Sequence, residues 1–203
     1  MLFQILKVLV GFYYKVFLGL KVTGRENIPE NEAFVLCANH LSLQDPILLT
    51  LVMGKRVRYM AKEELFKNKF LASIIRFFGA FPVQRGSGDM GIVTASSAII
   101  DGGEILMIFP QGTRDKKRKG LKGHTGAARI ACMSGVKMLP VGITDKYRLF
   151  GGLRVNIGKP VDCAIYRGKE MTQPEYADIT REVMGQIYEL SDIHPKKRIG
   201  EGV

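Results

Sequence analysis

The sequence predicts one α/β domain preceded by an amphipathic helix at the N-terminus. The chain has 203 residues, of which 46% are hydrophobic and 24% charged, and these values are typical of a single globular domain. Short apolar runs typical of buried strands alternate along the chain with stretches of helical periodicity. This alternation favours an α/β layer fold, in which functional sites lie beyond the strand ends.

The first twenty residues are the most apolar part of the chain. On a helical wheel, Gln4, Lys7, Gly11 and Lys15 share one face. Apolar residues gather on the other face: Leu2, Ile5, Leu6, Leu9, Tyr13, Val16, Phe17 and Leu20. The longest run without a charge is seven residues, whereas a membrane-spanning helix needs about 20. We therefore expect residues 1–21 to lie in one leaflet of a membrane, with the lysines at headgroup level; packing on the chain's own domain is the alternative.

Residues 22–192 are expected to form the α/β domain, and residues 193–203 a loose basic tail. Strands are predicted at 34–38, 57–60, 80–83, 105–109, 138–143 and 154–157. Helices are predicted near 46–53, 63–78, 90–101, 123–133 and 175–191. In 65–81, Phe and Ile residues alternate with Lys67, Lys69 and Arg76, which suits membrane contact or an acyl-chain groove, and equally core packing.

The chain is strongly basic, with 30 Lys+Arg against 19 Asp+Glu and a net charge of +11. This excess indicates an acidic partner, such as anionic lipid, a phosphorylated substrate or an acidic carrier protein. A nucleic acid is not expected, because Trp is absent and most aromatic residues lie in apolar runs. Cys37, Cys132 and Cys163 are widely spaced without a CxxC motif, so we expect buried thiols rather than disulfides or a zinc site.

The segment NHLSLQDP, residues 39–46, places His40 just after a predicted strand and Asp45 at the start of a predicted helix. Asp at the N-cap followed by Pro46 is a typical helix start. A carboxylate bonded to one imidazole nitrogen leaves the other nitrogen as a general base. The alternative is that Asp45 only caps the helix and that His40 is an ordinary loop residue, which explains the same spacing.

The segment AFPVQRGSGDMG, residues 80–91, contains a formal GxGxxG pattern. The candidate ribose acid, Asp101, follows Gly91 by only ten residues, so a dinucleotide site is not favoured. A flexible turn that directs Arg85 towards an anion is the simpler interpretation.

The segment IFPQGTRDKKRK, residues 108–119, follows another predicted strand. Gly112 allows close approach of the backbone to a ligand, Thr113 supplies a donor, and Arg114 at a strand end suits a bidentate grip on phosphate. Residues 113–122 carry six cationic side chains and one acidic one. The rest of this run fits attraction to an anionic membrane surface, or simply a solvated loop.

Four blocks in this order, NHLSLQD, FPVQR, FPQGTR and LPVGI, resemble those of the glycerolipid acyltransferase family, and most closely of its lysophosphatidate acyltransferases. The resemblance covers roughly residues 22–165. It implies a mixed β-sheet flanked by helices, with amphipathic N-terminal helices embedded in one leaflet. It also implies a membrane-associated, monotopic protein on the cytoplasmic face.

The resemblance assigns roles to individual positions. His40 matches the family's catalytic base and Asp45 the carboxylate that orients it. Lys62, Arg85 and Arg114 match residues at the substrate phosphate, and Arg85 lies in the block associated with acceptor binding. Gly112 and Thr113 match the third block, and Pro140 matches a block linked to the acyl end.

One position departs from the family, because the third block usually reads FPEGTR and residue 111 here is Gln. Gln keeps the shape and one acceptor oxygen but loses a charge and gains a donor. If Glu accepts a hydrogen bond from the acceptor, its loss could cost about 1.5–3 kcal/mol. The change is compatible with an altered acceptor or an impaired, lipid-binding variant.

The resemblance implies acyl transfer from acyl-CoA or acyl-carrier protein to the free 2-hydroxyl of lysophosphatidate, giving phosphatidate. No GxSxG motif marks a nucleophile, so we expect direct attack by that hydroxyl without an acyl-enzyme. We expect neither a metal nor a cofactor. A related acyltransferase that uses glycerol-3-phosphate or another lysophospholipid is the alternative enzyme.

Overall fold

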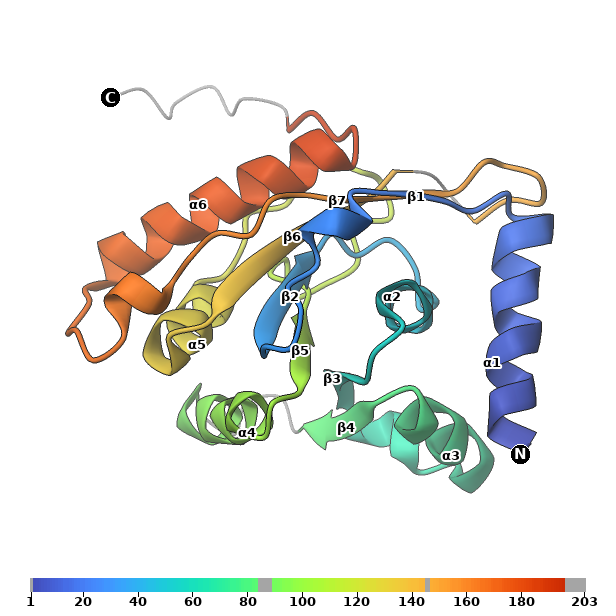
Figure 1. Cartoon of the computed structure of the whole chain (residues 1–203), viewed down its shortest axis with the longest axis horizontal. Coiled ribbons are helices and arrows are strands. Elements are labelled where there is room, and N and C mark those ends of the chain that lie inside the picture. Colours follow the sequence, from blue (N-terminus) through green and yellow to red (C-terminus); the bar gives the residue numbers. More distant parts are fainter. Residues whose placement is uncertain (1, 84–88, 145–146, 196–203) are drawn as a thin grey trace.

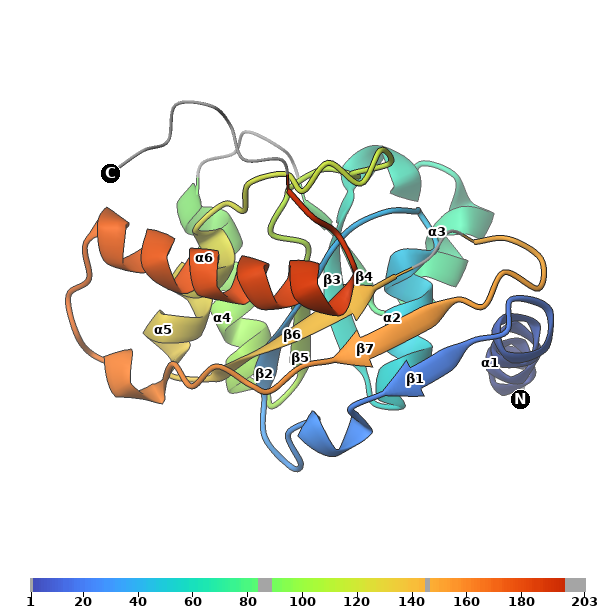
Figure 2. The same cartoon turned by 90° about the horizontal axis from the view of Figure 1, so that it is seen from above.

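A computed structural model of the chain describes residues 2–83, 89–144 and 147–195. Its centre is a seven-stranded sheet with the strand order β1-β7-β6-β2-β5-β3-β4 (Figures 1 and 2). The strands are β1 Lys21–Thr23, β2 Phe34–Ala38, β3 Val57–Lys62, β4 Ala80–Val83, β5 Ile105–Ile108, β6 Lys137–Ile143 and β7 Arg154–Ile157. Neighbouring strands are parallel except β6 and β7, so the predicted mixed sheet is confirmed.

Helices cover both faces of the sheet. They are α1 Leu2–Phe12, α2 Asp45–Met53, α3 Lys69–Phe77, α4 Asp89–Asp101, α5 Gly126–Ser134 and α6 Gln173–Leu190. Helices α4, α5 and α6 lie on one face, and α2 lies on the other together with α1 and α3 (Figure 1). None of the helices in the described part of the chain has the length and apolar character needed to cross a bilayer.

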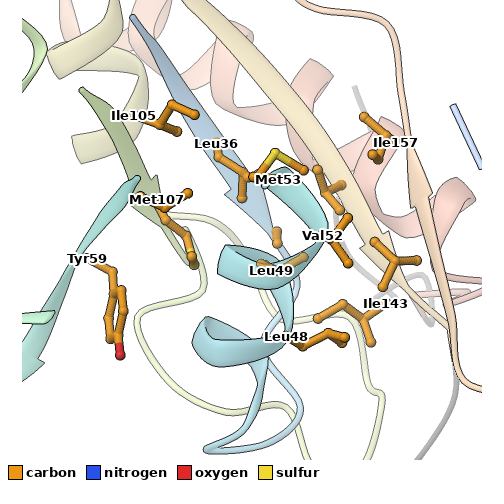
Figure 3. Packing of buried hydrophobic residues seen from close by; sticks show 14 of the residues in the cluster. Leu36, Leu48, Leu49, Val52, Met53, Tyr59, Ile105, Met107, Ile143 and Ile157 are labelled. Atoms are coloured by element: carbon orange, nitrogen blue, oxygen red, sulfur yellow. The ribbon is translucent and has the colours of Figure 1, made fainter. Parts of the chain in front are cut away.

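Side-chain alternation along the central strand explains why helices are needed on both faces. Phe34, Leu36 and Ala38 of β2 face the core beneath α2, whereas Val35 and Cys37 face the core beneath α5 and α6. Leu48, Leu49, Val52 and Met53 of α2 fill the first core (Figure 3). The three cysteines are buried free thiols, as the sequence predicts.

The N-terminal helix packs on the domain through the side that carries Lys7, and the expected apolar face points away from the domain. Helix α1 continues through a π-helical turn, Tyr13–Phe17, and Tyr14 and Leu18 enter the core. Lys7 was expected at headgroup level, yet its Nζ lies 5.4 Å from the centre of the Phe77 ring on α3. The expected polar face therefore rests on the domain because Tyr14 and Leu18 lie on the same side as Lys7.

The opposite side of α1 and of the π-helical turn after it leaves large apolar side chains exposed: Ile5, Val8, Leu9, Phe12, Tyr13, Val16 and Phe17. The predicted helix over 63–78 divides into a 3-10 turn, Glu63–Phe66, and α3. Strand β3 extends to Lys62, beyond its predicted end, and the short strand β1 was not predicted from the sequence.

Candidate active site

Three neighbouring strands bring the first and third blocks together at one edge of the sheet. Strands β2, β5 and β3 are parallel neighbours, so their carboxyl ends meet at this edge. His40 follows β2, Phe109 follows β5, and Lys62 ends β3. The register pairs Cys37 with Ile108, which places His40 level with the loop that follows β5.

His40 and Asp45 form the hydrogen bond that their spacing predicts. Nδ1 of His40 lies 2.7 Å from Oδ2 of Asp45, whose side chain is fully buried. The same oxygen accepts the backbone N–H groups of Leu41 at 2.6 Å and Ser42 at 2.7 Å. The predicted N-cap role is wrong, because α2 begins at Asp45 itself and Gln44 occupies the cap. The carboxylate bonds to the preceding loop instead of the helix, and this fixes it beside the imidazole.

The His40 ring has one nitrogen committed and one available. It stacks on the Phe109 ring with 4.1 Å between centroids and 19° between planes. The side chain is 17% exposed, and Nε2 makes no hydrogen bond with any residue that the structure describes. When Nδ1–H donates its hydrogen bond to Asp45, Nε2 carries a lone pair and can accept a proton.

The backbone of His40 is held by the third block on both sides. Its N–H donates to Oε1 of Gln111 at 2.8 Å, and its carbonyl accepts from the N–H of Asp115 at 2.7 Å. Gln111, expected to line the acceptor site, is only 3% exposed. Its Nε2 donates to the Tyr188 hydroxyl at 3.3 Å, and that hydroxyl donates to the carbonyl of Leu121. Gln111 therefore supports His40 from within the protein.

Two residues fold the basic loop onto the domain. Asp115 is buried, and its carboxylate accepts the N–H groups of Lys119 at 2.9 Å and Gly120 at 2.8 Å. Arg118 donates to the carbonyls of Thr144, Ser191 and Asp192. Arg118 is thus a structural link and not part of a solvated run. The remaining cations of 114–119, including Arg114 and Lys117, are exposed.

The structure places the other predicted residues at different distances from His40. Lys62 is exposed at the end of β3, two strands from β2, so about 10 Å separates the strand axes. Gly112 has a φ of +66°, and a Cβ there would lie 3.1 Å from the His124 ring, so the turn favours glycine. Pro140 is buried inside the sheet opposite Cys37, three residues before β6 ends. Arg85 lies outside the described residues.

The remaining residue of the third block, Thr113, is exposed beside Gly112 and Arg114. This segment therefore offers a hydroxyl and a guanidinium to solvent, directly after the residue that supports His40.

Sequence reasoning missed three residues that shape this edge, of which Asn39 and Tyr14 are buried and Tyr147 is partly buried. Asn39 joins β2 to β6, since its Nδ2 donates to the Ile143 carbonyl at 2.9 Å and its Oδ1 accepts the Ile143 N–H at 2.7 Å. Tyr147 donates to Oδ1 of Asp45 at 2.5 Å, and Tyr14 packs against the Tyr147 ring. Only Asn39, directly before His40 in the first block, had a local signal.

Comparisons with known proteins find similar sequences over most of the chain. A family model described as Acyltransferase matches residues 19–144. The chain is 34% identical to the 1-acyl-sn-glycerol-3-phosphate acyltransferase of Bacillus subtilis, over 70% of this chain and 74% of that protein. It is 32% identical to the protein of that name from Streptococcus pneumoniae, over 68% of this chain and 53% of that protein.

A solved structure is also similar, that of the 1-acyl-sn-glycerophosphate acyltransferase of Thermotoga maritima. The TM-score is 0.68 at 29% identity, and the match covers 87% of this chain and 74% of that chain.

Proposed function

The chain belongs to the acyltransferase family, and from this premise we propose that it transfers a fatty acyl group from a thioester to the 2-hydroxyl of lysophosphatidate, giving phosphatidate. The observation that carries the proposal is the 2.7 Å hydrogen bond between His40 and Asp45, which leaves Nε2 of His40 available. The names of the relatives support this acceptor.

The reaction that suits this arrangement is direct transfer with His40 as general base. The acceptor oxygen attacks the thioester carbonyl while Nε2 of His40 takes the hydroxyl proton. The new C–O bond forms, the C–S bond breaks, and the proton passes from His40 to the departing thiolate. An alcohol is too weak an acid for full deprotonation by imidazole, so proton transfer accompanies attack, and such assistance contributes about 10²–10⁴-fold.

Two exposed cations near the site are proposed to hold the acceptor's phosphate. Lys62 ends β3, and Arg114 follows the segment that supports His40. A guanidinium can grip two phosphate oxygens, whereas an ammonium acts as a compact point charge. Arg85 is proposed for the same role on its sequence block alone.

Membrane association is proposed from the apolar surface of α1. Leu9 and Phe12 are 59% and 56% exposed, while the other side of the helix packs on the domain. An apolar helix face of this kind is typical of helices that lie in the membrane interface. We propose a monotopic protein on the cytoplasmic face, where the lipid acceptor need not leave the bilayer to react.

The thioester donor is proposed to be acyl-CoA or an acyl-carrier protein. Lys116, Lys117 and Lys119 are exposed beside Arg114. These cations suit both the phosphates of CoA and the acidic surface of a carrier protein.

A purified-protein assay tests the proposal. Wild-type protein and a His40→Ala variant are incubated in mixed micelles with lysophosphatidate and either acyl-CoA or acyl-carrier protein, and free thiol and phosphatidate are both measured. We expect equal amounts of both products from wild type and a loss of about 10²–10⁴-fold in the variant, because the base is missing. Unchanged turnover in the variant would exclude His40 as the base.

The alternatives are outcomes of the same assay. Competition with glycerol-3-phosphate or another lysophospholipid identifies a different acceptor, and binding without turnover identifies a lipid-binding variant. The inward contacts of Gln111 favour an active enzyme over a lipid-binding variant. The amide that replaces the family's usual Glu has a hydrogen-bond partner for both its oxygen and its nitrogen.

A further inference from the structure

The carboxylate of Asp45 has a second oxygen that the proposed mechanism does not use. Oδ2 accepts from His40, Leu41 and Ser42, whereas the one donor to Oδ1 among the described residues is the hydroxyl of Tyr147 at 2.5 Å. A distance of this length is typical of a hydroxyl that donates to an ionised carboxylate. Without Tyr147, Oδ1 would be a buried acceptor with no partner among the described residues.

The environment of Tyr147 keeps the proton on the phenol. Burial, followed by the nearby negative charge of Asp45 and the hydrogen bond to it, raises the pKa of Tyr147 far above its usual range. The hydroxyl is therefore a permanent donor to Asp45.

Tyr147 is in turn supported by Tyr14 from the π-helical turn after α1. The two rings meet edge to face with 6.2 Å between centroids and 66° between planes. The Tyr14 side chain is buried, and its hydroxyl lies 3.4 Å from the carbonyl and 3.3 Å from Oε1 of Gln44, the residue before Asp45. Tyr14 thus contacts Tyr147, which donates to the Asp45 carboxylate, and Gln44, which precedes Asp45 in the chain.

Backbone hydrogen bonds join the segment that carries Tyr147 to the end of the N-terminal helix. The N–H of Phe150 donates to the Phe17 carbonyl at 2.5 Å, and the N–H of Leu153 donates to the Leu18 carbonyl at 2.9 Å. Both views show this loop beside the end of α1 (Figures 1 and 2). The end of the N-terminal helix is therefore linked, through this loop and Tyr147, to the carboxylate of Asp45.

We propose that Tyr147 is a positioning residue for acyl transfer, which fixes the second oxygen of Asp45 so that Asp45 holds the His40 ring, and that Tyr14 connects this arrangement to α1. The inference rests on the proposed role of His40 as base. Three donors on one carboxylate oxygen and one on the other fix the rotation of the carboxylate, and hence the direction of Nε2.

The kinetic test compares Tyr147→Phe and Tyr14→Phe with Tyr59→Phe, a control whose side chain is buried and whose hydroxyl lies 3.5 Å from the Ile75 carbonyl on α3. We expect Tyr147→Phe to lower kcat about 10- to 100-fold, because a hydrogen bond to a charged group is lost. Both KM values should stay within about 2-fold, since no substrate contact is removed. Tyr14→Phe should give a smaller loss and Tyr59→Phe none. Unchanged kcat in Tyr147→Phe, or a rise in KM alone, would overturn the proposal.

A double-mutant cycle tests whether Tyr147 acts through Asp45. In an Asp45→Asn background, Tyr147→Phe should lower kcat by less than about 2-fold, because the oriented carboxylate is already absent. Equal losses in both backgrounds would overturn the proposal.

A readout without turnover separates this proposal from the function itself. NMR of ¹⁵N-labelled histidine in detergent micelles reports the tautomer of His40. We expect the Nδ1–H form in wild type and Tyr59→Phe, and a mixture of both tautomers in Tyr147→Phe. If wild type transfers no acyl group to any acceptor, the proposed function fails, while an unchanged spectrum in Tyr147→Phe refutes the positioning role.

Discussion

Replacement of Asp45 by asparagine removes one charge from the active site and keeps the size of the side chain. When His40 takes the proton, an imidazolium forms next to the carboxylate, whose Oδ2 lies 2.7 Å from Nδ1. Two opposite unit charges whose centres lie about 4 Å apart attract by about 4 kcal/mol at an effective dielectric constant of about 20, a value that also serves for buried sites. The loss of this attraction in the transition state corresponds to about a 10³-fold decrease in kcat.

The fold should survive this change better than it survives alanine. The asparagine oxygen can still accept from Leu41 and Ser42, while its amide can donate to the Tyr147 oxygen. We therefore expect the free energy of unfolding to fall by about 1–3 kcal/mol, and more for Asp45→Ala, which leaves these donors without a partner.

Steady-state assays with lysophosphatidate and a thioester, together with thermal unfolding, measure both effects. Asp178→Asn is the matched control, because Asp178 pairs with Arg181 on the exposed side of α6. This control should keep kcat and lose little stability. If Asp45→Asn lowers kcat by less than about 10-fold while its fold is intact, electrostatic stabilisation of His40 by Asp45 is wrong.

Three further perturbations test other parts of the structure. Gln111→Glu should lower the free energy of unfolding by about 2 kcal/mol and the melting temperature by about 4–8 °C, because a carboxylate cannot donate to Tyr188. The exposed control Gln173→Glu should not, and equal melting curves would contradict the assigned contact. Arg114→Ala should raise the KM for lysophosphatidate about 10- to 100-fold and leave the donor KM within about 2-fold, unlike the control Lys169→Ala. Equal effects on both substrates would remove Arg114 from the phosphate site. The double change Leu9→Glu and Phe12→Glu should reduce co-sedimentation with anionic vesicles at least about 100-fold, whereas Ile165→Glu, also at an exposed apolar residue, should not. Unchanged sedimentation would refute the membrane role of α1.

Local patterns predicted the α/β architecture and the contact between His40 and Asp45. The strands are short apolar runs, and a spacing of five residues across a strand-to-helix turn leaves few ways to separate the two side chains. Strand β1 was missed because three residues carry too little pattern to identify a strand.

The residues that surround the pair could not be predicted in this way. Tyr147 lies 102 positions from Asp45 and Tyr14 lies 30 positions from Gln44, so only the tertiary fold brings them together. The side through which α1 packs on the domain could not be predicted for a related reason. A helical wheel distinguishes two faces but does not determine which one the domain covers, and Tyr14 and Leu18 decided it through the core space they fill.

The attachment of His40 to its neighbouring loop affects how loss of turnover by variants in that loop should be interpreted. Both polar groups of the histidine's main chain are bonded to residues 111 and 115, so a shift of this loop turns the ring even when no substrate contact has changed. A damaged Asp115 would then resemble a damaged base in a rate assay. Substrate affinity, measured apart from turnover, would separate loop residues that touch the ligand from those that hold the histidine in place.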